Sequence, residues 1–459
     1  MKIYKDKYKI PDGYSTAKLI LRSVLFLRRN TIKGISMNMD KFGDAYSAIF
    51  PGDKLLIITQ DPGFIQHVLR DNHTNYRKSE FTTGKVGRLF GKGLLFSNGD
   101  YWLQQRRLIQ PGFHTRRLQG LYKLMTGTIE KAIAEWPAGE KIDVYPLVYQ
   151  LAFDIILRSL FDIDLKPEEK KEMSLLFNQM QEFVIKDMNR PLRQLFYRIT
   201  RQDKINLRRS VRMRNIIRAI IHQRQKDKKE YSDLLDMLLG ARYEDTGEAM
   251  SEDQIIDEVL VLLLAGHETT ANTLSWLLSL ASTHPDVLSR LKTIAESTDI
   301  HDSVRNDYIN AVINESMRLR PAAFMTDRVA VTDDHYGPWT FPKGAVVLSF
   351  FYGLHRHGDH WQHADVFQPE RWLDDAGKLR KMIAFFPFGA GPRLCIGNNF
   401  AIAEMCFFVH AFFRRFSIAS TGHTPNMLPL ITLRPDKVLL QLHRVGTATV
   451  TGATSTYPV

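Results

Sequence analysis

Apolar residues recur at helical spacing through much of the chain. Within residues 101–236 this spacing is interrupted mainly at prolines, which predicts a series of helices. Ser251 and Gln254 form a capping-box pattern before an apolar stretch, and a long helix is predicted to run from there to residue 284, where Pro285 stops it. Another helix is predicted over residues 305–320. The chain is therefore expected to be mainly helical.

Shorter apolar, β-branched stretches predict a few strands. Residues 45–50 and 54–60 flank Pro51-Gly52-Asp53 and predict a hairpin, followed by a helix over residues 62–70. Residues 321–351 are rich in predicted strand, with a turn at 342–344, and the last strands are predicted at 430–433 and 438–442. The glycine-rich residues 74–99 are predicted to form a mobile loop that presents apolar side chains. Small sheets are thus expected near both ends of the chain.

Composition favours one large intracellular domain. The chain has 459 residues, of which 44% are hydrophobic, and it shows neither an internal repeat nor a long linker. We predict a basic N-terminal segment (1–34), a single domain (35–445) and a disordered tail (446–459). Two cysteines exclude a disulfide framework and suit a reducing cytoplasm. The apolar residues 19–27 are too few for a spanning helix, so no transmembrane anchor is expected, and the protein is predicted to be soluble, cytoplasmic and monomeric.

The net charge of +12 is unevenly distributed. Residues 201–230 hold eleven Lys or Arg residues against three acidic ones. Such a run is compatible with nucleic-acid binding, with contact to anionic lipid, or with the solvated face of a long helix. Isoleucines recur in it at helical spacing, so we favour the solvated helix and expect no nucleic-acid partner.

Cys395 lies in the glycine-rich segment 388–397, FGAGPRLCIG. Arg393 precedes it by two residues, and a helix is predicted to begin directly after it. A guanidinium group and the positive end of a helix dipole both lower the pKa of a thiol, so Cys395 is predicted to be a thiolate. The alternative is a buried core cysteine, an interpretation that suits Cys406 in its apolar run.

The spacing of Phe388, Gly391, Arg393, Cys395 and Gly397 resembles the haem-binding loop of the cytochrome P-450 superfamily, and the resemblance covers about residues 35–445. It implies the cytochrome P-450 fold, which is mainly α with small β-sheets and a long central helix over the haem. It also implies haem b as the cofactor, with Cys395 as the axial ligand of the iron and Phe388 and Arg393 among its contacts. A thiolate in that position favours cleavage of the O–O bond.

A polar interruption lies inside the long predicted helix, at residues 265–270, AGHETT. An unpaired carboxylate is costly in an apolar helix, so Glu268 marks a functional position unless the helix is simply kinked there with an exposed glutamate. The segment resembles the oxygen-activation motif of the family. The resemblance implies two catalytic residues, Thr269, which bonds to the oxygen that is being reduced, and Glu268, which relays protons through water. His267 is expected to be structural.

Three charged residues match a structural network of the family. Glu315 and Arg318 share a helix face at the i, i+3 spacing, which is uninformative by itself. Residues 367–372, FQPERW, resemble the segment that supplies the third member, Arg371. The resemblance implies that these residues hold the loop that carries Cys395.

Further positions are assigned to the haem by the resemblance. Trp102 and Arg106, four residues apart on one predicted helix, are both able to donate to a carboxylate, and the family uses this pair to bind a haem propionate. Arg328 lies where the family places another propionate-binding arginine. Gln105 stands where the family often has a histidine, which leaves that contact near the propionate open. Gly358 stands where proline is usual, and a looser turn is expected there.

The implied activity is a monooxygenase that inserts one oxygen atom from O2 into a lipophilic small molecule, which we expect to be a fatty acid, terpenoid, steroid or polycyclic compound. Two alternatives are a peroxide-driven peroxygenase of the same fold and a non-catalytic haem-binding sensor. The pocket is expected to be lined by apolar residues, namely Phe81, Val86, Leu89, Phe90, Leu264, Ala265, Ala322, Phe324 and Met325.

No pattern in the chain indicates a flavin or iron–sulfur domain of its own. Electrons are therefore expected from a separate ferredoxin or flavodoxin and its reductase, so that NAD(P)H is used only indirectly. Such carriers are usually acidic, and we expect them to contact basic residues near Arg106, such as Arg107, Arg116 and Arg117.

Overall fold

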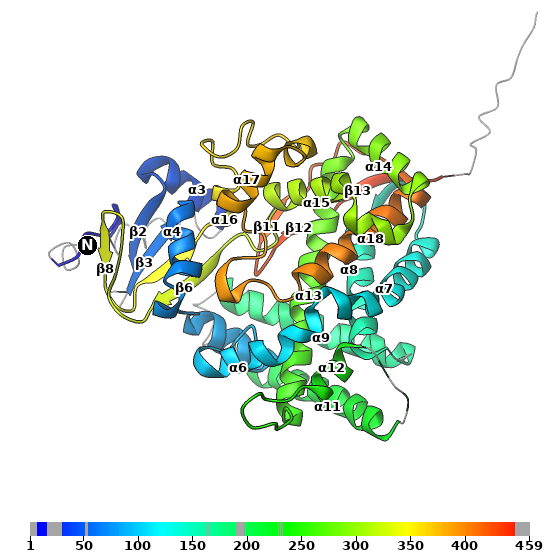
Figure 1. The fold of residues 1–459 in the computed structure, drawn as a ribbon, viewed down its shortest axis with the longest axis horizontal. Coiled ribbons are helices and arrows are strands. Elements are labelled where there is room, and N and C mark those ends of the chain that lie inside the picture. Colours follow the sequence, from blue (N-terminus) through cyan, green and yellow to red (C-terminus); the bar gives the residue numbers. More distant parts are fainter. Residues whose placement is uncertain are drawn as a thin grey trace, which may run out of the picture.

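Helices occupy most of the molecule, and the largest sheet lies at one end of it (Figure 1). The structure is a computed structural model that describes residues 7–15, 30–50, 54–162, 165–189, 197, 199–227, 229, 231 and 233–445. The apolar stretch 19–27 and the tail 446–459 of the sequence predictions lie outside these residues. The helical majority with small sheets confirms the predicted fold class.

The helices are distributed along the whole described chain, and strands separate some of them. Their bounds are α3 (Thr31–Phe42), α4 (Pro62–Gln66), α5 (Gly87–Phe90), α6 (Gly99–Ile109), α7 (Thr115–Glu135), α8 (Tyr145–Phe161), α9 (Pro167–Asn189), α11 (Gln202–Lys226), α12 (Leu234–Gly240), α13 (Glu252–Ala281), α14 (Pro285–Ser297), α15 (Asp307–Leu319), α16 (Phe351–Leu354), α17 (Asp375–Ala384) and α18 (Asn398–Arg415). Single 3-10 or π-helical turns join several of them, among them η2 (His67–Asp71), η4 (Phe81–Val86), η8 (Pro369–Trp372) and η9 (Gly391–Arg393).

The strands form one six-stranded sheet and three smaller ones. Their bounds are β1 (Gly13–Tyr14), β2 (Ala45–Phe50), β3 (Lys54–Thr59), β4 (Tyr76–Arg77), β5 (Gly139–Asp143), β6 (Thr326–Ala330), β7 (Asp334–Tyr336), β8 (Trp339–Phe341), β9 (Val346–Ser349), β10 (Phe416–Ser420), β11 (Met427–Pro429), β12 (Leu433–Pro435) and β13 (Leu439–Arg444). The large sheet has the order β1-β2-β3-β9-β6-β4. Its β2–β3 pair is antiparallel with Ala45 opposite Thr59, which confirms the predicted hairpin.

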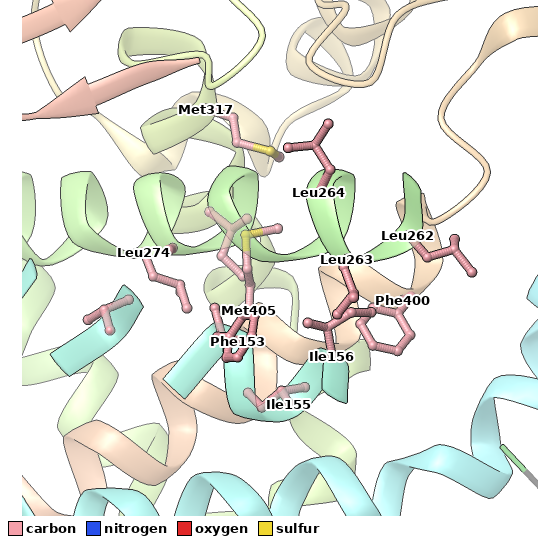
Figure 2. Packing of buried hydrophobic residues seen from close by; sticks show 14 of the residues in the cluster. Phe153, Ile155, Ile156, Leu262, Leu263, Leu264, Leu274, Met317, Phe400 and Met405 are labelled. Carbon is pink, nitrogen blue, oxygen red and sulfur yellow. The ribbon is translucent and has the colours of Figure 1, made fainter. Parts of the chain in front are cut away.

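The central helix α13 is buried along most of its length. Ser251 and Gln254 bond reciprocally at its N-terminus, so the predicted capping box is present. Figure 2 shows that Leu263 and Leu264 leave α13 in different directions, Leu263 toward Ile156 of α8 and Leu264 toward Met317 of α15. Apolar residues on different sides of a helix predict burial all round. The helix therefore passes through the core rather than along the surface.

Three sequence-predicted elements differ in the structure. The central helix ends at Ala281 rather than at residue 284, because Pro285 starts α14 at a position where a helix needs no N–H group. Residues 74–99 are not one loop but hold β4, η4 and α5. Of the strand predicted over residues 430–433, only Leu433 lies in a strand, β12. Residues 430–432 form a tight turn between β11 and β12, in which the Leu430 N–H bonds to the carbonyls of Leu428 and Thr432.

The basic segment forms the helix α11, and four of its arginines, Arg212, Arg214, Arg218 and Arg224, form ion pairs. Arg212 bonds to Glu172 of α9 at 2.7 Å. Arg218 and His222 both bond to Glu252 at the start of α13, at 2.7 and 2.6 Å. These pairs support the interpretation of this run as a solvated helix face. In the part of the chain that the structure describes, no helix combines the length and apolar character that crossing a membrane requires.

Candidate functional site

The loop that carries Cys395 lies between the η9 turn and α18. The Cys395 N–H donates to the Phe388 carbonyl at 3.0 Å, which closes the loop. Gly391 has a φ of +67°, and a Cβ atom there would collide with the Leu69 carbonyl oxygen. Only glycine permits both this conformation and this close approach. The loop is therefore held in a defined shape against the η2 turn.

The Cys395 side chain is exposed, although it lies deep in the protein. Burial raises the pKa of its thiol, while the Gly397 N–H and the Arg106 guanidinium act in the opposite direction. An exposed but poorly hydrated group lies on the wall of an interior space. Local groups lower the pKa of this thiol as predicted, although the charge is that of Arg106 rather than Arg393, but the loss of water outweighs them and the net shift is upward.

The sequence suggested that the charge of Arg393 acts on the Cys395 thiol, but in the structure Arg393 contacts other groups. Its guanidinium lies over the Trp102 ring of α6, with 4.1 Å between the guanidinium carbon and the ring centroid. It donates to the Ser97 carbonyl and to Asn98 Oδ1, both at 3.0 Å. The cation that acts on the thiol is instead Arg106, whose Nη1 donates to the Leu394 carbonyl at 2.8 Å. Trp102 and Arg106, the two residues of α6 that the resemblance assigns to the haem, therefore both contact the Cys395 loop.

A cluster of three cations lies beside this loop. Burial lowers the pKa of Arg393 to about 9, and the charge of Arg328 contributes to the shift. Burial also lowers the pKa of Arg328, to about 10. Lys78 has a pKa far below its usual range because of burial and the charges of Arg328 and Arg393. The cluster consequently favours binding of an anion.

Lys78 was missed by the sequence reasoning. It follows β4, and its Nζ donates to the Leu95 carbonyl at 2.7 Å. Asp327 is the carboxylate that counteracts the shift of both Lys78 and Arg328. A lone lysine after a short strand carries no motif, so no local signal could have revealed it. The two arginines that lower its pKa, Arg328 and Arg393, come from β6 and from the Cys395 loop.

On α13, Ala265 is exposed between buried neighbours. The Thr269 hydroxyl donates to the Ala265 carbonyl at 2.6 Å, one turn back along the helix. The neighbouring Glu268 is buried, and burial raises the pKa of its carboxyl. Gln181 Nε2 donates to Glu268 Oε2 at 2.7 Å and Thr432 Oγ1 donates to Oε1 at 2.8 Å. Thr269 therefore borders accessible space, whereas both oxygens of Glu268 are occupied by protein donors.

The structure brings Glu315, Arg318 and Arg371 together. Arg318 binds Glu315 through two parallel hydrogen bonds, 2.9 Å from Nε to Oε2 and 2.8 Å from Nη2 to Oε1. Arg371 Nε adds a bond of 3.1 Å to Oε1, and Trp372 Nε1 adds one of 2.9 Å to Oε2. Glu315 and Arg318 are fully buried. Arg318 also bonds to the carbonyls of residues 355, 364 and 366, so the network ties α15 to the segment that precedes the Cys395 loop.

The predicted pocket residues fall into two groups. Val86, Leu89, Phe90 and Leu264 belong to the main core, and Ala265 faces open space. Phe324 is buried in a smaller cluster with Ile32 and Phe350, and Met325 packs against that cluster. Ala322 is partly buried and accepts from the Leu433 N–H at 2.9 Å. The side chain of Phe81 lies outside the described part of the chain.

These features fit a flat ligand that carries a metal and carboxylates. An accessible cysteine sulfur is a ligand for iron, the cluster of Lys78, Arg328 and Arg393 suits carboxylates, and Ala265 leaves room beside α13. Haem b has this chemistry, with an iron at its centre and two propionates at its edge. The residues present therefore match the cofactor that the resemblance implies.

Comparisons with known proteins agree with this arrangement. The family model "Cytochrome P450" matches residues 13–442. The chain is 30% identical to the cyclooctat-9-en-7-ol 5-monooxygenase of Streptomyces melanosporofaciens over 71% of this chain and 72% of the relative. It is 27% identical to the pentalenene oxygenase of Streptomyces avermitilis over 75% of this chain and 77% of the relative. The solved heme domain of cytochrome P450DA superposes with a TM-score of 0.85 at 22% identity, covering 95% of this chain and 97% of that one.

Proposed function

Because this chain belongs to the cytochrome P450 family and is a cytochrome P450 monooxygenase, we propose that Cys395 is its haem ligand and that a cyclic terpenoid is its substrate. The observation that carries the first part is the accessible but poorly hydrated Cys395 thiol beside the cluster of Lys78, Arg328 and Arg393. Cys406 is fully buried in the core, which makes it unsuitable as a ligand.

The haem supplies the iron at which O2 is bound and reduced. Around it, the chain's own residues have separate tasks in this proposal. Arg393, Arg328 and Lys78 hold the propionates, while Arg106 fixes the Cys395 loop through the Leu394 carbonyl. The Thr269 hydroxyl, now bonded to the Ala265 carbonyl, turns to hold a water beside α13. Glu268 passes a proton to that water, and burial, which raises the pKa of its carboxyl, favours the protonated form.

The terpenoid proposal rests on two kinds of observation. The pocket residues Val86, Leu89, Phe90 and Leu264 are apolar, and apolar lining favours a hydrocarbon skeleton. The relatives named for cyclooctat-9-en-7-ol and pentalenene are oxygenases of such skeletons. Fatty acids are the competing class, since a leukotriene-B4 omega-hydroxylase of Mus musculus is 28% identical over 75% of this chain and 72% of the relative.

We propose a separate acidic ferredoxin or flavodoxin as the electron donor. Arg107, Arg116 and Arg117 are exposed, and no ion pair joins any of the three to a carboxylate of the described residues. A basic surface attracts an acidic partner and raises its association rate. Arg106 bonds to the Cys395 loop directly, so a carrier docked here is close to the cofactor.

The assignment of Cys395 is tested by the spectrum of the reduced protein with CO. Thiolate-ligated haem has a strongly red-shifted Soret band, which Cys395→Ser should abolish and Cys406→Ser should preserve. A normal band in the Cys395 variant would refute the assignment. Titration with pentalenene, a long-chain fatty acid and a steroid, followed by the spectral change on displacement of iron-bound water, then decides the substrate class. NAD(P)H-dependent product formation with added redox partners distinguishes the monooxygenase from a peroxygenase or a sensor.

A further inference from the structure

Glu268 is bonded to two elements other than its own helix. Gln181, which donates to Oε2, lies on α9, and Thr432, which donates to Oε1, lies in the turn between β11 and β12. Both donors are buried, with 5% and 7% of their surfaces exposed. The carboxyl of Glu268 therefore links α13 to two segments that are distant from it in the sequence.

The network continues beyond both donors. The Tyr149 hydroxyl lies 3.2 Å from Gln181 Oε1 and 2.7 Å from Asn178 Oδ1, so its one proton is shared between these two acceptors. On the other side, Asn272 Nδ2 donates to Thr432 Oγ1 at 2.9 Å, and the Tyr145 hydroxyl donates to Asn272 Oδ1 at 3.2 Å. Gln181, Thr432 and Asn272 each donate in the direction of Glu268, and each arm passes through an amide. Because an amide does not ionise, neither arm is a route for protons to Glu268.

Both anchoring segments contact residues of the proposed pocket. On α9, the ring of Phe177 packs against Phe90, with 5.7 Å between the ring centroids. Next to Thr432, the Leu433 N–H donates to the Ala322 carbonyl at 2.9 Å. A substrate that displaces Phe90 or Ala322 therefore acts on the two segments that hold the carboxyl of Glu268.

We propose that Gln181 and Thr432 are positioning residues. They hold the Glu268 carboxyl away from the water beside Thr269 until substrate binding releases it. This inference rests on the proposed function. In the released state, the O–H bond of the Glu268 carboxyl breaks, and the proton passes to the water beside Thr269. The carboxylate then takes up a new proton from solvent water. Proton delivery would in this way depend on occupation of the pocket.

Two variants remove one bond each. Thr432→Val deletes the hydroxyl with little change in volume, and Gln181→Leu deletes the amide donor. With saturating redox partner and no added substrate, each should raise NAD(P)H oxidation about tenfold, because one of the two hydrogen bonds that hold the Glu268 carboxyl is lost. The infrared band of the Glu268 carboxyl, identified by its absence in Glu268→Gln, should shift in both variants. Haem content and melting temperature should stay close to wild type.

The controls separate this role from general support of the fold. Thr432→Ser keeps the hydroxyl and should restore the low oxidation rate. Asn178 bonds to Tyr149 at 2.7 Å one turn before Gln181, without a contact to Glu268 among the described residues, so Asn178→Leu should leave the rate unchanged. In a Glu268→Gln background, Thr432→Val should have no effect on the rate.

Wild-type or slower oxidation by both variants, with intact haem and stability, would overturn the proposal. Loss of haem in both would overturn it as well, because the bonds would then support the fold rather than hold back a proton. If Thr432→Val alone fails to fold, Gln181→Leu decides. None of these results bears on the identity of the haem ligand, which the CO spectrum of the Cys395 variant tests independently.

Discussion

The guanidinium carbon of Arg393 lies 4.1 Å from the centroid of the Trp102 ring, so a residue of the Cys395 loop stacks on a residue of α6. A cation over an indole face is attracted to the electron-rich ring. Stacked in this way, Arg393 belongs to a group of neighbouring cations. The charge of Arg328 lowers the pKa of Arg393, and the charges of both arginines lower the pKa of Lys78. The charge of Arg393, which the sequence placed beside the sulfur, therefore belongs to the cluster of Lys78, Arg328 and Arg393.

Lys78→Met should have opposite effects on the haem-free and haem-bound proteins. Without haem, the variant should be more stable than wild type, because a buried cation next to Arg328 and Arg393 is removed. With haem, it should lose the cofactor about tenfold faster, because a charged hydrogen-bond donor to a propionate is missing. Melting temperatures of both forms and haem transfer to apomyoglobin measure these effects. The exposed Lys437→Met is the control, and an unchanged transfer rate would remove Lys78 from the haem site.

Glu315→Ala or Arg318→Ala should yield mostly haem-free or aggregated protein. Each leaves a buried charge without its partner, at a cost of about 3–5 kcal/mol. Arg212→Ala breaks an exposed pair with Glu172 and should leave haem content unchanged. Haem absorbance per protein and thermal unfolding measure the outcome. Normal values for either variant of the buried pair would show that the network does not support the Cys395 loop.

Thr269→Ala and Glu268→Gln should have distinguishable effects. Thr269→Ala should fold and bind haem, yet consume NAD(P)H without forming product, so that hydrogen peroxide accumulates. Glu268→Gln should instead slow turnover, since general acid–base groups contribute about 10²–10⁴-fold. Added hydrogen peroxide should bypass much of that second defect because it already carries its protons. The readout is product formed per NAD(P)H, and wild-type coupling in Thr269→Ala would contradict the assigned role.

Stability should decrease with rising pH because of Glu258. This buried carboxyl accepts from the Leu94 N–H at 3.0 Å, and burial raises its pKa from 4.5 to about 8. An acid with a raised pKa in the folded state stabilises the protein when protonated, and that contribution is lost as pH rises from about 4.5 to about 8. Glu258→Gln keeps an acceptor for Leu94 and should flatten the dependence of melting temperature on pH over this range. An equally steep decline in the variant would assign the effect to other groups.

The sequence predicted those parts of the site that depend on neighbouring residues. The capping box of Ser251 and Gln254 and the pairing of Glu315 with Arg318 follow from helical spacing, and both are present in the structure. The glycine pattern around Cys395 follows from backbone geometry, which Gly391 illustrates with its positive φ. Such features are local, and the amino-acid order is sufficient to specify them.

Only the tertiary structure decided which distant side chains meet. Lys78 joins Arg328 and Arg393 although the three lie on separate elements, and Gln181 and Thr432 reach Glu268 from α9 and from the β11–β12 turn. The folded environment also reversed the expected shift at Cys395, because desolvation raises the pKa of the thiol more than the nearby charges lower it. Contacts between remote segments and the loss of water around them arise from packing, which has no signature in any single stretch of sequence.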